Sequence, residues 1–161
     1  MKVISYDDKY KNQIVALILY LQNFENRVDL SLEEQPDMND INSYYLKDGG
    51  GFWLALDDEN NLIGTIGLMK KDNNCGILKK FFVLPKYRGK ELGISNELFK
   101  NLIGYAKQCR IKKIVLDSPF ACQRAHVFYK KAGFKHIEKE ELPIKYDYPD
   151  RNSYLFMKIL E

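Results

Sequence analysis

The chain has 161 residues, of which 45% are hydrophobic and 29% charged, with 9 Phe and 11 Tyr. This is the length of one ordinary domain with enough apolar material for a packed core, which excludes an intrinsically disordered chain. The net charge is only +3, but lysines and arginines are concentrated in residues 70–135 and acidic residues predominate on either side. A basic block favours an anionic ligand and an acidic segment a cationic one, although solvated surface charge explains both equally well.

Several other classes of protein are disfavoured because their signatures are absent. No run of 18 apolar residues predicts a membrane span, and the first residues, MKVISYDDKYKNQ, lack the apolar stretch of a signal peptide. The cysteines Cys75, Cys109 and Cys122 share no metal-type spacing and are typical of reduced thiols, so we expect a cytoplasmic protein. With only His126 and His136 as histidines, we expect no metal site.

The first third of the chain predicts a strand and two helices. Residues 2–5 are typical of a short strand, and residues 7–24 place apolar side chains at helical spacing after a possible cap at Asp7 or Asp8. Residues 25–51 are polar and acidic, with a short helix expected after Pro36 and three glycines to end it.

The middle of the chain predicts an antiparallel meander. Residues 52–56, 62–69 and 75–84 have the composition of strands, and the Asp- and Asn-rich segments between them are typical of hairpin turns.

The last part of the chain predicts alternating helices and strands. We expect helices over 91–109 and 121–133, the second stopped at Gly133, and strands over 112–116, 134–138 and 153–160. A proline-containing connection, residues 142–152, joins the last two strands. The fold class is therefore α/β, a mixed central sheet that combines an antiparallel meander with a parallel strand–helix–strand crossover, flanked by helices. We expect residues 1–161 to form a single domain.

The turn between the third meander strand and the next helix has the chemistry of an anion site. Its sequence, PKYRGKELGIS, places Gly89 and Gly93 at the start of a helix whose first N–H groups have no partner inside it. Lys86, Arg88 and Lys90 add positive charge, which favours a phosphate or pyrophosphate ligand. The P-loop and dinucleotide-binding patterns are both absent.

This stretch, FFVLPKYRGKELGISNELF, resembles the acetyl-coenzyme A motif of the GCN5-related N-acetyltransferase (GNAT) superfamily. That motif, [Gln/Arg]-x-x-Gly-x-[Gly/Ala], corresponds here to residues 88–93, with Glu91 where the family has its first glycine. The glutamate keeps the backbone amide that faces the pyrophosphate in the family. A second segment, RAHVFYKKAGF (residues 124–134), resembles the family pattern A-x-x-[F/L]-Y-x-x-x-G-F. EEQPDM, GGGFWLAL and IGTIGL resemble an unassigned bacterial branch of the family.

The resemblance implies a GNAT-type fold and acetyl-CoA as co-substrate. In such proteins the pantetheine arm lies where two central strands separate, held by backbone groups of the meander strand. The residues that the resemblance assigns to the coenzyme are Phe82, Val83, Arg88, Gly89, Lys90, Gly93, Ile94 and Ser95.

The resemblance also implies a general acid but no clear general base. Tyr129 matches the tyrosine that lies near the coenzyme sulfur, and a phenol can donate a proton to the departing thiolate. The family often has a glutamate on the preceding strand, where this chain has Lys79 and Lys80, one of which we expect to face solvent. The remaining candidates for a base are Glu25, Glu33, Glu34, Asp37 and His126, and a water relay or an acceptor amine that is already partly deprotonated would need no strong base.

The expected activity is acetyl transfer to a primary amine of a small molecule or a peptide. The acidic segment lies where the family builds its acceptor pocket, so we expect Glu25 and Asp37 to contact the acceptor and to favour a cationic amine. The alternative is a catalytically silent GNAT-like module that binds or senses acyl-CoA. No nucleic-acid-binding motif accompanies the basic block, so we expect neither nucleic acid nor membrane as a partner, and a monomer or a homodimer.

Overall fold

The computed structural model describes residues 1–148 and 152–160, and its centre is one seven-stranded sheet in the order β1-β2-β3-β4-β5-β7-β6. Neighbouring strands are antiparallel except β4 and β5, which are parallel, as expected for a meander followed by a crossover. Residues 149–151 of the predicted connection lie outside the described part. The strands are β1 (Lys2–Ser5), β2 (Gly51–Leu56), β3 (Leu62–Lys71), β4 (Cys75–Val83), β5 (Lys113–Pro119), β6 (Lys135–Ile137) and β7 (Ser153–Ile159).

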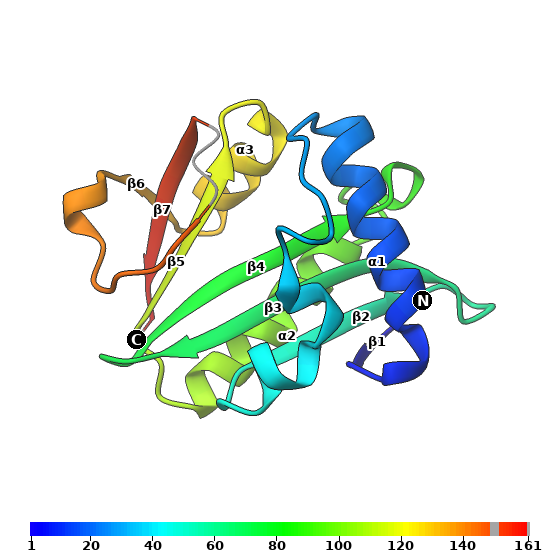
Figure 1. The fold of residues 1–161 in the computed structure, drawn as a ribbon, viewed down its shortest axis with the longest axis horizontal. Helices are drawn as coiled ribbons and strands as arrows, with labels where there is room; N and C mark the ends of the chain where they lie inside the picture. The colour runs from blue at the N-terminus through cyan, green and yellow to red at the C-terminus, as the bar shows by residue number, and fades with distance from the viewer. Residues whose placement is uncertain (149–151, 161) are drawn as a thin grey trace.

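Helices cover both faces of the sheet (Figure 1). Helix α1 (Lys11–Tyr20) packs its apolar stripe on one face, and α2 (Ile94–Gln108) and α3 (Gln123–Lys131) pack on the other. Among the described residues, none of the helices is long and apolar enough to cross a membrane. The two resulting apolar cores fix the positions of the strands between them.

The predicted elements are all present, and where their ends differ from the predicted ones the reasons are local. Asp7 caps the first helical turn through the Lys9 N–H, and α1 continues as a π-helical segment, Leu21–Glu25. Helix α2 begins at Ile94 rather than 91, because Gly93 adopts a left-handed conformation (φ +67°) as its N-cap. Strand β5 extends beyond the expected end to Pro119, because it pairs with β7 along its whole length.

Strands β4 and β5 are paired at one end only. Their backbones register at three positions, Cys75 with Lys113, Gly76 with Ile114 and Ile77 with Val115, and then diverge (Figure 1). Each strand continues past that point, so the middle of the sheet opens into a V-shaped gap between them.

A β-bulge interrupts β4 beside this gap. Two residues of β4, Lys80 and Phe81, stand opposite a single position of β3, and Lys80 has a positive φ of 55°. The hydroxyl of Thr65 on β3 donates to the Lys80 carbonyl at 2.6 Å. This contact fixes the bulge. The extra residue of the bulge changes which side chains of β4 face each side of the sheet.

Candidate functional site

One cavity of about 1090 Å³ follows the gap between β4 and β5. At one end it is lined by the turn before α2 and the start of α3, and at the other by the π-helical segment and the acidic loop after it. Such a volume accommodates a long ligand and a small second molecule. Because the two ends differ in chemistry, each is described separately.

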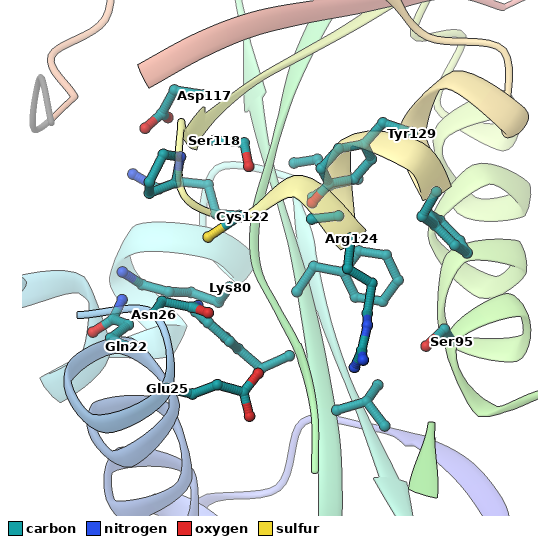
Figure 2. A pocket seen from close by; sticks show the side chains of 18 of the residues that line it. Gln22, Glu25, Asn26, Lys80, Ser95, Asp117, Ser118, Cys122, Arg124 and Tyr129 are labelled. Atoms are coloured by element: carbon teal, nitrogen blue, oxygen red, sulfur yellow. The ribbon is translucent and has the colours of Figure 1, made fainter. Parts of the chain in front are cut away.

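The turn before α2 presents an open backbone surface to the cavity. Gly89 (φ +115°) and Gly93 both have positive φ, and a Cβ built on either would meet nothing within 4 Å. Ser95 lines the cavity from the first turn of α2, whose initial N–H groups lack helical partners (Figure 2). The side chain of Ile94 is buried in the core, so only its backbone can serve a ligand there. Glu91 is exposed and lies outside the cavity lining.

Arg88 connects the turn to both neighbouring elements. Its Nε donates to the Val83 carbonyl at 2.8 Å, and its guanidinium lies 2.6 Å from the Glu25 carboxylate. Glu25 therefore lines the cavity as the partner of a motif residue. Its predicted contact with an acceptor stays a prediction.

The end of β4 offers one set of backbone groups to the gap. The Leu84 N–H donates to the Ile63 carbonyl of β3 at 2.9 Å, and Phe82 lies opposite Thr65 in the same ladder. Since backbone groups alternate along a strand, the N–H and C=O of Val83 point away from β3, toward the gap. Of the two predicted backbone contacts, Val83 faces the ligand space, whereas Phe82 contributes its side chain to the cavity wall.

Tyr129 on α3 directs its hydroxyl toward the gap (Figure 2). Its ring packs against Phe81, Phe134 and Phe156, with centroids 5.6–6.3 Å away, and the residue is only 6% exposed. Burial raises the pKa of the hydroxyl above its usual value. The phenol therefore stays protonated at neutral pH and can donate its proton.

The other end of the cavity holds a buried polar network around Asp37. The Asp37 carboxylate accepts a hydrogen bond from Tyr45 at 2.7 Å and lies 3.8 Å from the Lys80 ammonium. Gln35 accepts from the same ammonium at 2.5 Å and exchanges two hydrogen bonds with Gln22, at 2.8 and 2.9 Å. Asp37 is thus fixed by neighbours on two sides at the cavity wall.

The expectation that one of the two lysines faces solvent stays a prediction for Lys79, which is half-buried in the cavity lining. Both Lys79 and Lys80 line the cavity, and the Lys80 side chain is only 8% exposed. The bulge explains this, because an extra residue breaks the alternation and leaves consecutive side chains on one side of the strand.

The comparisons with known proteins agree with this geometry. The family model described as the acetyltransferase (GNAT) family matches residues 9–134. The chain belongs to the GNAT acetyltransferase family. An N-acetylaspartate synthetase of Xenopus tropicalis is 33% identical over 105 residues, which are 64% of this chain and 38% of that protein. The chain thus spans well under half the length of this relative.

Two solved structures match nearly the whole chain. A GNAT-family acetyltransferase from Staphylococcus aureus is 33% identical with a TM-score of 0.94, and the match covers 99% of both chains. An acetyltransferase from Streptococcus agalactiae is 37% identical with a TM-score of 0.93, covering 99% of this chain and 98% of that one. The expected GNAT fold is therefore confirmed.

The remaining predicted candidates for a base differ in where the GNAT fold places them. Glu34 lines the cavity and accepts from the Ser31 hydroxyl at 3.1 Å, whereas Glu33 is exposed and outside the lining. His126 is buried behind the wall, with Nε2 3.1 Å from the Ser118 hydroxyl, and burial lowers its pKa. His126 is therefore a neutral core residue.

Three cavity residues could not be assigned from the sequence. Arg124, at the start of α3, extends toward the turn before α2, where it adds positive charge beside Ser95 (Figure 2). Asp117 and Cys122 lie on the opposite wall, and burial raises the pKa of both. Arg124 belongs to the second segment that resembles the family, but its position opposite the turn depends on how α3 packs and could not be predicted from the sequence. Asp117 was hidden because the predicted strand ended one residue before it.

Proposed function

We propose that the chain transfers the acetyl group of acetyl-CoA directly to a primary amine of a small molecule. The observation that carries this proposal is the gap between β4 and β5, with the Tyr129 hydroxyl facing it and the glycine turn at its mouth. The cavity fits the coenzyme in its basic, open turn and in its unpaired strand edge. Coenzyme A, when bound, supplies the activated acetyl thioester.

Each part of the coenzyme has residues suited to hold it. The turn amides around Gly89 and Gly93, together with Lys90, Ser95 and Arg124, would hold the pyrophosphate. The backbone of Val83 would pair with the pantetheine arm as a strand pairs with its neighbour. The acetyl end then lies near the bulge, within the space that Tyr129 faces.

Tyr129 would act in the step that releases the coenzyme. The acceptor nitrogen attacks the thioester carbonyl, the carbon–sulfur bond breaks, and the sulfur needs a proton to leave as a thiol. The Tyr129 hydroxyl, kept protonated by burial, donates that proton. The acceptor must first lose a proton, either to water or to a second group at the other end of the cavity.

Two observations support a proposal for the acceptor class, the names of the relatives and the pairing of the acids at this end of the cavity. The N-acetylaspartate synthetases act, by their name, on an amino acid. The two acids predicted to favour a cationic amine already have cationic partners, Glu25 in Arg88 and Asp37 in Lys80. We therefore propose an amino acid or a similarly small amine as the acceptor, and the preference for a cationic amine stays a prediction.

The first experiment is a thermal shift with acetyl-CoA, ATP and NAD in parallel. A ligand that binds only the folded protein raises its stability with concentration, so acetyl-CoA should stabilise the protein well above the others. Thiol release is then followed with L-aspartate, L-glutamate and spermidine. Stabilisation without transfer to any amine would favour the silent acyl-CoA-binding module, and an equal shift with ATP would contradict the coenzyme site.

A further inference from the structure

The bulge in β4 brings a lysine to the end of the cavity opposite the glycine turn. Lys80 stands where β4 and β5 diverge, and its side chain is nearly buried at the acceptor end of the cavity. In Figure 2 it lies between Asp117 on β5 and the end of the π-helical segment, where Gln22 is followed by the C-cap residue Asn26. A side chain held there faces whatever small molecule enters from that end.

The contacts of Lys80 hold its nitrogen in place but use only part of its hydrogen-bonding capacity. The ammonium donates to Gln35, and the Asp37 carboxylate lies at the longer distance of 3.8 Å. Gln35 is itself locked by its paired hydrogen bonds with Gln22, and Asp37 by Tyr45. An ammonium has three N–H donors, so the two contacts leave one direction of the nitrogen for a ligand.

The surroundings of Lys80 also favour its neutral form. Burial lowers the pKa of Lys80 to about 8, and the positive charge of Lys79 adds to that effect, while Asp37 and Asp117 oppose it. These are the charged groups that face Lys80 from β4, from the 3-10 turn Pro36–Asn39 and from β5. A base whose pKa lies near the operating pH is effective in proton transfer.

We propose that Lys80, as the free amine, removes a proton from the acceptor ammonium and so produces the nucleophile. This role rests on the proposed function. The acceptor nitrogen then forms its bond to the acetyl carbon, the carbon–sulfur bond breaks, and the sulfur takes its proton from Tyr129. The Lys80 ammonium returns its proton to solvent, and Tyr129 is reprotonated. Gln35 and Asp37 are positioning residues that hold and tune Lys80.

The proton state of Lys80 can be measured without an acceptor. Lysine labelled with ¹³C at Cε is titrated by NMR, and Lys80→Arg assigns the resonance. We expect Lys80 to titrate near pH 8, to move to lower pH in Asp37→Asn and to higher pH in Lys79→Gln, because these neighbours act in opposite directions. Titration at the ordinary value of about 10.4 would overturn the proposal.

The catalytic role is tested by the pH dependence of kcat/KM for two acceptors whose amines differ in pKa. The wild type should gain activity as pH rises through about 8 with both acceptors. This rise forms the acidic limb of the pH profile. If the limb reported the ionisation of the acceptor instead, its midpoint would move with the acceptor's own pKa. Lys80→Arg keeps the charge but cannot lose a proton, so kcat/KM at pH 8 should fall about 10²-fold or more and this limb should disappear. Asp37→Asn should move the limb to lower pH and Lys79→Gln to higher pH.

The outcomes separate the two proposals. Transfer by folded Lys80→Arg at the wild-type rate would overturn the role of Lys80 and leave the proposed function intact. If the acidic limb of the pH profile disappeared in Asp117→Asn but persisted in Lys80→Arg, the base would be Asp117 instead. No transfer by the wild type to any amine would overturn the proposed function, and the role of Lys80 with it.

Discussion

Tyr129 combines a packing role and a chemical role, and the two can be separated. Its ring is enclosed by aromatic neighbours, whereas no hydrogen bond within the described part of the chain uses its hydroxyl. Tyr129→Phe should therefore change the free energy of unfolding by less than about 0.5 kcal/mol. It should lower kcat about 10²-fold while the Kd of acetyl-CoA stays within about twofold. Chemical denaturation, titration calorimetry and thiol release measure the three quantities, and an unchanged kcat would exclude Tyr129 as the acid.

Glu25 and the coenzyme compete for the same guanidinium. The Glu25–Arg88 pair is partly exposed, and such pairs contribute up to about 1 kcal/mol. If Arg88 turns toward the pyrophosphate on binding, Glu25→Gln should raise the affinity for acetyl-CoA by up to about fivefold. Arg88→Gln should lower it.

The acceptor KM of Glu25→Gln separates the two roles of this residue. A raised KM would support the predicted acceptor contact. A weaker affinity for acetyl-CoA would instead mean that Glu25 holds Arg88 in its binding orientation.

At the scale of elements, one glycine caps α2 and another lies within it, and the two have opposite roles. Gly93 is its left-handed N-cap at the cavity, whereas Gly104 lies in the body of the helix, and a Cβ at either position meets nothing within 4 Å. Gly93→Ala should cost about 1 kcal/mol of stability, because a left-handed conformation is unfavourable for alanine. It should also weaken acetyl-CoA binding by placing a methyl group where the phosphates approach.

Gly104→Ala is the matched control for this change. Alanine is a better helix former, so stability should rise by about 0.5–1 kcal/mol with no change in acetyl-CoA affinity. Denaturation curves and binding titrations of the two variants measure both effects. Equal affinities in both variants would show that the turn does not hold the phosphates.

The site could be predicted where its residues are neighbours in sequence, and not where it depends on packing. Arg88, Gly89 and Gly93 lie in one turn, so their spacing alone indicates an anion site. Lys80 could not be assigned, because its inward direction depends on a bulge that lies opposite the position after Thr65 and that no composition signals. Asp37 was recognised as an acid, but its partners Tyr45 and Lys80 come from other elements.

At the scale of the whole molecule, the order of the elements and the type of sheet followed from alternation, helical spacing and turn residues. What those patterns could not give was the extent of each strand. Asp117 and Pro119 have poor strand propensity, yet residues 117–119 belong to β5 because β7 supplies partners for them. Tertiary pairing decided that boundary, and with it the length of the wall that faces the ligand.

The short junction between β4 and β5 divides the sheet into two leaves. One leaf contains β1 to β4, the other contains β5, β7 and β6, and their backbones are joined at only three registered positions. A ligand that pairs with Val83 and contacts α3 would bridge the leaves beyond that junction. Acetyl-CoA should then slow amide hydrogen exchange in residues 78–83 and 116–119 more than in β1 or β2, as exchange mass spectrometry would record. The coenzyme would then also serve as a structural brace between the two leaves.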